Sequence, residues 1–193
     1  MGKRSNYIKK ITGKEINLFK QLARTGLTDK SQSKQFFKIN PNRLNQLENS
    51  KYIKRYNSCV AGKNTQLIQL DEKGIIFCRN KLGIDKLAHS QSNHLEHDLK
   101  VTYAYNQLPE EVQETWEHER EIIADIYDKN KDIESKYLNE KQGLKTCIDA
   151  RVTINGVSVA IEIVGSSYSQ ADIELKEDIA VNLAECNSIE FLY

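Results

Sequence analysis

Two carboxylates, Asp149 and Glu162, stand in the part of the sequence with the strongest β-strand pattern. Apolar residues alternate with polar ones over 148–154, Asn155-Gly156 is a favoured type I′ hairpin turn, and 157–164 has the pattern of a buried return strand. We expect such a hairpin to bring both carboxylates to one end of a sheet. Paired hard oxygen ligands are what a Mg²⁺ site needs, with room left for water and a phosphate. Asp149 and Glu162 are therefore our candidate metal ligands and catalytic residues.

An Asp followed by a Glu on the adjacent strand resembles the skeleton of the PD-(D/E)XK nuclease motif. The full motif places a lysine two residues after the Glu, where it polarises the attacking water, and this chain has Val164 there. Lys176, in the helix expected over 170–186, is the nearby lysine that can substitute, so we include it among the catalytic candidates. The alternative reading is a solvated lysine on that helix.

Four short segments of the chain are relevant to a wider resemblance: His97-Asp98-Leu99, Trp116 to Glu121, Ile148-Asp149-Ala150 and Val159 to Val164. Together they resemble the replication-relaxation family of mobile-element proteins. That resemblance implies a winged helix joined to a PD-(D/E)XK-like domain, on plasmids, phages or conjugative elements. It matches Glu119 to the family's acid after the tryptophan, Asp149 to the motif aspartate and Glu162 to the motif glutamate.

The first half of the chain has its own pattern of short helices followed by a hairpin. Helices are expected over 11–26 and 28–37, with Thr28-Asp29 as the cap of the second. Asn40-Pro41 predicts the start of a third helix over 41–50, because Asn caps helices well and Pro suits their first position. A hairpin over 51–70 and a helix after Asp71 follow. This order is typical of a winged helix-turn-helix domain, with the third helix as the recognition helix.

The exposed positions of that third helix predict contacts with DNA bases, since Arg pairs well with guanine and Asn or Gln with adenine. Basic residues on the hairpin and its flanks lie where phosphates are expected. The alternatives are a protein–protein module and ordinary solvated side chains. The candidate base-reading residues are Asn42, Arg43, Gln46 and Asn49, and the candidate phosphate contacts are Lys51, Lys54, Arg55 and Lys63.

The charge of the chain is divided between its halves, although the formal net charge is only +1. Residues 1–90 contain 19 Lys and Arg against 6 Asp and Glu, whereas residues 91–193 contain 9 against 21. The basic half favours a polyanion such as nucleic acid. The other reading is that the two halves, or two copies of the chain, attract each other. We expect a cytoplasmic protein, because no apolar run is long enough to span a bilayer or act as a signal peptide and the four cysteines are widely spaced.

The acidic half has sequence patterns of both helices and strands. We expect helices over 90–108 and 170–186, a polar excursion over 128–143 and a last strand over 189–193, while 111–121 permits strand or helix. Gly83 and the polar run over 90–93 are the best linker candidate. The predicted fold class is therefore α+β, with a winged helix-turn-helix domain over 1–88 and an α/β PD-(D/E)XK-like domain over 89–193.

Three functions are compatible with these observations. The first is a DNA-binding regulator or accessory factor of a mobile element, with a degenerate nuclease-like domain and double-stranded DNA as its partner. The second is an active endonuclease that needs Mg²⁺. The third is a phage or plasmid protein that inhibits or docks on a host protein complex as a homodimer. Metal dependence separates the first two, and the salt dependence of DNA binding separates both from the third.

Overall fold

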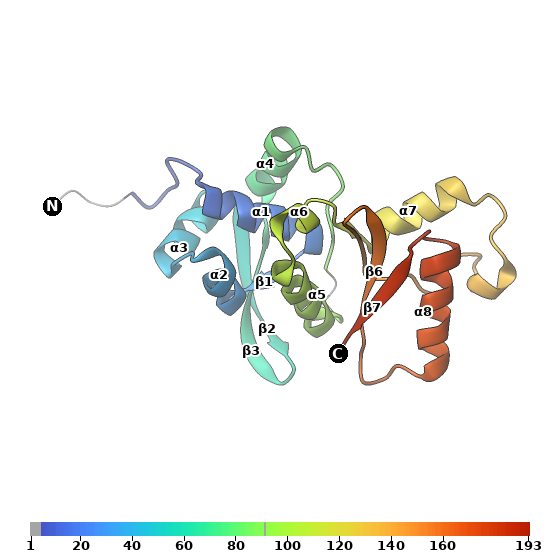
Figure 1. Ribbon diagram of the computed structural model, residues 1–193. Helices are drawn as coiled ribbons and strands as arrows, with labels where there is room; N and C mark the ends of the chain where they lie inside the picture. Colours follow the sequence, from blue (N-terminus) through green and yellow to red (C-terminus); the bar gives the residue numbers. More distant parts are fainter. Residues whose placement is uncertain (1–4, 91) are drawn as a thin grey trace. The chain divides into compact units, whose positions relative to one another are not determined.

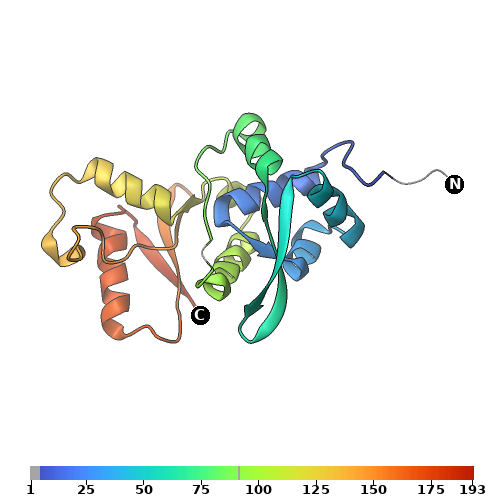
Figure 2. The same cartoon turned by 180° about the vertical axis from the view of Figure 1, so that it is seen from behind.

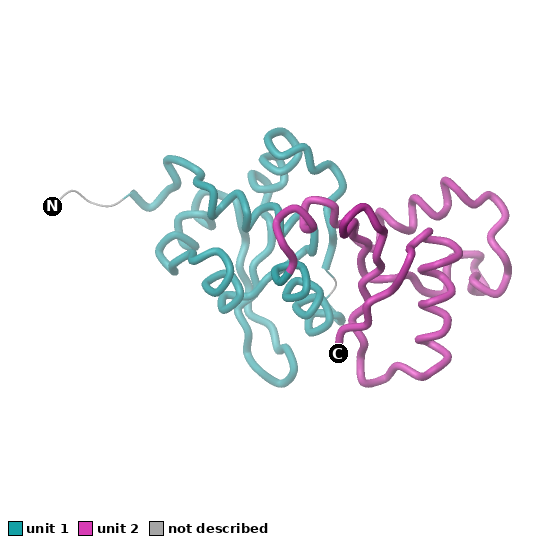
Figure 3. Tube along the Cα trace, viewed as in Figure 1, with its two compact units in different colours: residues 1–107 teal, residues 108–193 magenta. Residues whose placement is uncertain are grey.

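The computed structural model describes residues 5–90 and 92–193 and divides into two compact units, Met1–Gln107 and Leu108–Tyr193 (Figure 3). We call them unit 1 and unit 2. Each has its own sheet and helices, so the chain is a mixed α+β protein with two sheets, as expected. Within the described residues, no helix is both long and apolar enough to cross a membrane. Gln91 of the expected linker lies outside the described residues.

Unit 1 contains the expected succession of three helices, a hairpin and a helix, together with one short strand and one further helix (Figure 1). Strand β3 lies between β1 and β2 and is antiparallel to both. The elements are α1 (Gly13–Thr25), β1 (Thr28–Asp29), α2 (Lys30–Phe37), α3 (Pro41–Asn49), β2 (Ile53–Val60), β3 (Lys63–Leu70), α4 (Glu72–Leu82) and α5 (Leu95–Gln107).

Side-chain caps fix where the helices of unit 1 begin. Asp29 accepts a hydrogen bond from the backbone of Gln32 at 2.7 Å and starts α2. Asn40 accepts from the backbone N of Arg43 at 2.9 Å, with Pro in the first turn of α3. Each cap satisfies a backbone N–H that the helix cannot pair internally. The starts expected at Asp29 and Asn40-Pro41 are therefore confirmed, and they set the direction in which α3 presents its side chains.

The core of unit 1 lies between α1, α3, α4 and the sheet. The rings of Phe19 and Tyr52 stack with centroids 5.6 Å apart, and Phe77 packs edge-on against Phe19. Helix α4 approaches the backbone so closely that a Cβ on Gly74 would lie 2.1 Å from the carbonyl oxygen of Tyr52. The fully buried members of this core include Leu18, Phe19, Ala23, Leu47, Ile53, Ile68 and Cys78.

Helix α5 belongs to unit 1, which moves the boundary from the expected residue 88 to Gln107. The hydroxyl of Thr102 is fully buried and donates to the carbonyl oxygen of Leu27 at 2.7 Å. Leu95 packs in a separate apolar cluster with Leu27 and Leu67. The charge pattern and the linker candidate placed α5 in the acidic half, because this helix carries acidic residues. Its buried face nevertheless packs on unit 1.

Unit 2 is a four-stranded sheet in the order β4-β5-β6-β7, with α7 and α8 on the same side in both views (Figures 1 and 2). Strands β6 and β7 are parallel and the other pairs are antiparallel. The elements are α6 (Glu110–Gln113), β4 (Glu117–His118), α7 (Glu119–Lys129), a 3₁₀ turn (Ser135–Tyr137), β5 (Ala150–Ile154), β6 (Val157–Ile163), α8 (Gln170–Asn182) and β7 (Ser188–Leu192).

The hairpin at the centre of unit 2 forms as the sequence predicts. Asn155 and Gly156 have φ of 52° and 79°, the left-handed values that a type I′ turn requires, and Ile154 pairs with Val157. The ambiguous segment 111–121 contains helix α6, the short strand β4 and the start of α7. Because the hairpin fixes the register of β5 and β6, it also fixes where Asp149 and Glu162 lie.

Candidate functional site

Three asparagines form an open row along α3. Asn42, Asn45 and Asn49 are solvent-exposed and recur at the spacing that places side chains on one helix face. Asn42 and Asn49 were expected there, whereas Asn45 was not, although its spacing from Asn42 and Asn49 was a readable signal. An amide side chain both donates and accepts hydrogen bonds, which is the chemistry of an adenine edge.

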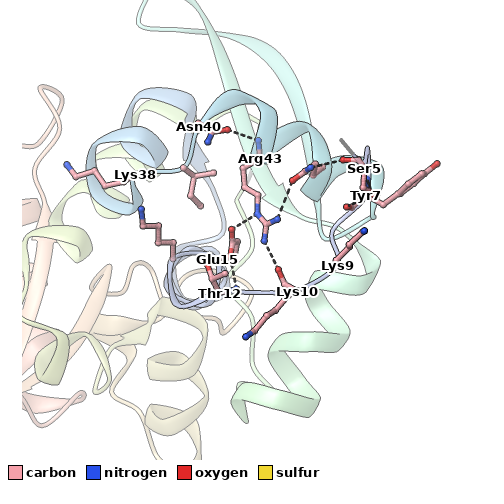
Figure 4. Close-up of a pocket in the computed structure, with 12 residues that line it drawn as sticks. Ser5, Tyr7, Lys9, Lys10, Thr12, Glu15, Lys38, Asn40 and Arg43 are labelled. Carbon is pink, nitrogen blue, oxygen red and sulfur yellow. Dashed lines mark hydrogen bonds and ion pairs between the residues drawn. The ribbon is translucent and has the colours of Figure 1, made fainter. Parts of the chain in front are cut away.

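Arg43 does not point freely to solvent, in contrast to its expected role in reading guanine. Its Nε donates to Glu15 at 2.6 Å and one terminal nitrogen donates to the carbonyl oxygen of Lys10 at 2.6 Å (Figure 4). Burial of Glu15 opposes ionisation, but hydrogen bonds from Arg43 and Thr12 outweigh it and hold the pKa of Glu15 below its usual value. The guanidinium is therefore an internal link between α3, α1 and the segment before α1.

Residues 5–11, which we call the N-terminal arm, lie against α3. Gln46 donates through its amide to the carbonyl oxygen of Ser5 at 2.7 Å, and Asn49 donates to that of Asn6 at 3.2 Å. In the other direction, the backbone N of Ile8 donates to the Ser50 hydroxyl at 2.9 Å. Gln46 thus binds the chain itself, and Asn49 uses part of its amide in the same way. A periodicity argument about α3 could not detect this arm.

The hairpin supplies a smaller set of free cations than expected. Lys54 and Lys63 are exposed, and Lys51 is exposed with its ammonium 4.0 Å from Asp71. Arg55 is instead held against α3, where it donates to Asn45 at 2.8 Å and forms a close ion pair with Glu48. Arg55 is therefore engaged within unit 1, because the hairpin packs on the helix that carries Glu48, and its role as a phosphate contact stays a prediction.

A cationic groove opens beside the N-terminal arm (Figure 4). It has a volume of about 670 Å³, and its described lining residues include five cations and a single carboxylate, Glu15, which already pairs with Arg43. A second hollow of about 420 Å³ is lined largely by asparagines of α3 and its cap. The two hollows share Ser5, Asn40, Arg43 and Gln46, so they form one continuous surface.

In unit 2, Asp149 and Glu162 come together as predicted. The backbone N of Asp149 donates to Glu162 Oε2 at 3.1 Å, and the backbone N of Ile163 donates to Asp149 Oδ2 at 2.8 Å. Glu119 begins α7 next to them, and its backbone N donates to the carbonyl oxygen of Asp149 at 3.2 Å. The pair therefore lies where β5 begins and β6 ends.

Lys176 is buried and reaches this pair from α8. Its ammonium lies 2.6 Å from Glu162 Oε1, while Glu162 is 0% and Lys176 6% exposed. The alternative of a solvated helix lysine is therefore wrong. The ammonium also donates to the carbonyl oxygen of Cys147, and the Tyr168 hydroxyl donates to Glu162 Oε1 at 2.6 Å.

Burial has a large electrostatic effect on this cluster. It raises the pKa of Glu162, and the nearby Asp149 carboxylate adds to that effect, against the lowering influence of Lys176 and Tyr168. Burial, followed by the hydrogen bond to Glu162, also raises the pKa of Tyr168. The hydrogen bonds from Lys176 and Tyr168 favour the charged form of this carboxyl group, whereas burial and Asp149 favour the neutral form.

The cluster does not fit a divalent cation as arranged. Both oxygens of Glu162 already accept hydrogen bonds, from Lys176, Tyr168 and the backbone of Asp149. Within the described parts of the chain, no group of three or more His, Cys, Asp or Glu side chains is placed to hold a metal ion. Mg²⁺ binds through several oxygen ligands, and here it would have to displace the buried ammonium. The metal-ligand role of Asp149 and Glu162 therefore stays a prediction.

Comparison with known proteins adds no assignment to this geometry. No protein-family model, curated protein or solved structure matches the chain. The resemblance to the replication-relaxation family rests on the sequence segments alone. The features that bear on function are the surface of α3 with its groove in unit 1 and the Asp149–Glu162 cluster in unit 2.

Proposed function

We propose that the protein binds duplex DNA through unit 1 and acts as a regulator or accessory factor. The observation that carries this proposal is the open asparagine row of α3, in a part of the chain with 19 basic and 6 acidic residues over 1–90. Support also comes from the element order and from the β1-β3-β2 sheet, an arrangement that suits a winged helix-turn-helix domain.

Each part of this surface has a distinct role in the proposal. Helix α3 enters the major groove, where Asn42 contacts base edges through its whole amide. Asn45, whose side-chain oxygen accepts a hydrogen bond from Arg55, contacts them through its amide N–H groups. Lys54 and Lys63 on the hairpin contact phosphates, which fixes the register of the protein on the duplex. Arg43 and Gln46 take no direct part in base contact, because they bind the arm.

Unit 2 is assigned no catalytic step. The regulator reading is favoured over the Mg²⁺-dependent endonuclease because every oxygen of Glu162 is engaged by a protein donor and Lys176 fills the space beside it. In this proposal the cluster holds α8 against the sheet. A mobile-element setting rests on the sequence resemblance and remains part of the proposal only.

The test begins with a duplex selected from a random-sequence pool by the purified full-length protein. Affinity for this duplex is then measured by fluorescence anisotropy over a salt series, with and without Mg²⁺. We expect log Kd to rise linearly with log salt concentration, and we expect no strand cleavage in Mg²⁺. Absence of binding at about 50 mM salt, where phosphate contacts are strong, overturns the proposal.

The role of α3 is tested with Asn42→Ala and Asn45→Ala, each against Asn80→Ala as the matched control, an exposed asparagine on α4. Each α3 change should weaken binding to the selected duplex by about 1–3 kcal/mol and relax base preference at one position, while the control does neither. Equal losses on selected and unrelated duplexes would assign these residues to non-specific contact instead.

A further inference from the structure

We propose that the cationic groove beside the N-terminal arm is a binding site for the phosphodiester backbone of the DNA that α3 contacts. This inference rests on the proposed DNA-binding function and deepens it. It moves the main phosphate contact from the hairpin, where the sequence placed it, to the arm, the start of α1 and the turn between α2 and α3.

The charge of the groove points to an anion. Its cations are Lys9 and Lys10 of the arm, Lys14 in the first turn of α1, Lys38 between α2 and α3, and Arg43. Its one described carboxylate, Glu15, is 3% exposed and bound to Arg43, so it offers little repulsion to an incoming phosphate. Four exposed lysines remain to face the ligand.

The arm is held in place by the helix it accompanies. Arg43, Gln46 and Asn49 donate from α3 to the carbonyl oxygens of Lys10, Ser5 and Asn6. These three side chains are therefore positioning residues. They fix a chain segment that has no helix or strand of its own, and with it the backbone positions of Lys9 and Lys10.

The position of the groove identifies the ligand as a nucleic-acid backbone. The groove shares Asn40, Arg43 and Gln46 with the asparagine-lined hollow of α3. The lysines of the groove and the amide side chains of the hollow are therefore adjacent parts of one surface. A polymer that carries phosphates next to base edges matches both halves of this surface, since phosphate contacts position a protein and base contacts specify the sequence.

The experiment replaces all four groove lysines (Lys9, Lys10, Lys14 and Lys38) with glutamine in the full-length protein. The matched control replaces four exposed cations of α4 and the segment after it (Lys73, Arg79, Lys81 and Lys86). Both variants lose the same charge, so a difference between them reports the site and not the net charge. Thermal unfolding checks that each variant folds like the parent.

Binding to the selected duplex is measured over the same salt series. Each lost phosphate contact lowers the slope of log Kd against log salt by about 0.9, so the loss of all four lysine contacts should lower the slope by about 3.6. The control should retain most of the parental slope. A groove variant with the parental slope, from a parent that binds DNA, overturns this inference and leaves the proposed function standing, whereas a parent that does not bind overturns both.

A competition experiment separates nucleic acid from acidic protein as the ligand. Unlabelled duplex of unrelated sequence should displace the labelled DNA at much lower charge concentration than poly-glutamate does. Equal displacement by poly-glutamate assigns the groove to acidic protein segments and overturns the inference. Arg43→Gln adds a test of positioning, because release of the arm should lower the salt slope and speed hydrogen exchange at Ile8, whose amide is bonded to Ser50.

Discussion

Lys176 Nζ lies 2.6 Å from Glu162 Oε1, inside unit 2, and joins the middle of α8 to strand β6. Both side chains are almost fully buried, and their further hydrogen-bond partners are Tyr168, the backbone N of Asp149 and the carbonyl oxygen of Cys147. Removing water from two charges is costly, so the pair is tolerated because its bonds are complete. The free-energy cost of replacing one of the two residues therefore depends on whether the other is present.

The first prediction concerns breaking this pair. Lys176→Met leaves a buried carboxylate without its cation and should lower the free energy of unfolding by about 3–5 kcal/mol. The double variant Lys176→Met with Glu162→Leu should recover most of that loss, because no unpaired charge remains buried. Urea denaturation followed by circular dichroism measures both. Additive losses in the double variant would show that the two side chains act independently.

The second prediction concerns pH. The pKa of Glu15 is lowered in the folded state below the ordinary value of 4.5. Its contribution to stability is therefore present above pH 4.5 and is lost as the pH falls through the lower folded pKa. The stability of the parent chain should therefore fall more steeply below about pH 4.5 than that of Glu15→Gln. Urea denaturation between about pH 2 and 6 compares them. Parallel pH profiles would show that Arg43 and Thr12 do not hold this carboxylate.

The third prediction concerns two helical glycines. Gly74→Ala should destabilise the protein by about 1–3 kcal/mol, because the new Cβ would lie 2.1 Å from the Tyr52 carbonyl oxygen, which is backbone and cannot move cheaply. Gly13 begins α1 with open space around it, so Gly13→Ala is the matched control and should be neutral or stabilising. Thermal unfolding measures both, and equal effects would refute the close approach of α4.

The fourth prediction concerns the boundary of unit 1. A fragment of residues 1–107 should fold cooperatively, whereas a fragment of 1–88 should be less stable by about 2 kcal/mol or more, since it lacks Leu95 and the buried bond from Thr102 to Leu27. Denaturant unfolding of both fragments supplies the comparison. Equal stability of the two would return the boundary to the linker that the sequence suggested.

Local signals in the sequence predicted much of this fold. Caps such as Asp29 and Asn40, and the Asn155-Gly156 turn, act within a few residues, so their effects can be read directly from the chain. The juxtaposition of Asp149 and Glu162 followed from the same turn, because a hairpin fixes which residues face each other. The α+β class followed from these elements together.

The rest depends on contacts between residues far apart in the chain. Nothing near Lys176 indicates that its ammonium reaches the carbonyl oxygen of Cys147, and nothing near Arg43 indicates that its partners are Glu15 and Lys10. A charged residue on a helix is usually solvated, so the sequence favours that reading until tertiary packing removes the water. For this reason Arg43 and Gln46, which the sequence placed among the base-reading residues, instead contact the N-terminal arm.

The parallel pairing of β6 with β7 has a consequence for synthesis of the protein on the ribosome. The strands of unit 1 are complete once Leu70 has emerged, but the edge of β6 that carries Ile161 and Ile163 waits for α8 and then for β7. A nascent chain therefore passes through a stage in which unit 1 can fold while one edge of an apolar strand of unit 2 is unpaired. Parallel pairing across a helix is slow to form, so this stage is the one most exposed to aggregation and to chaperone binding.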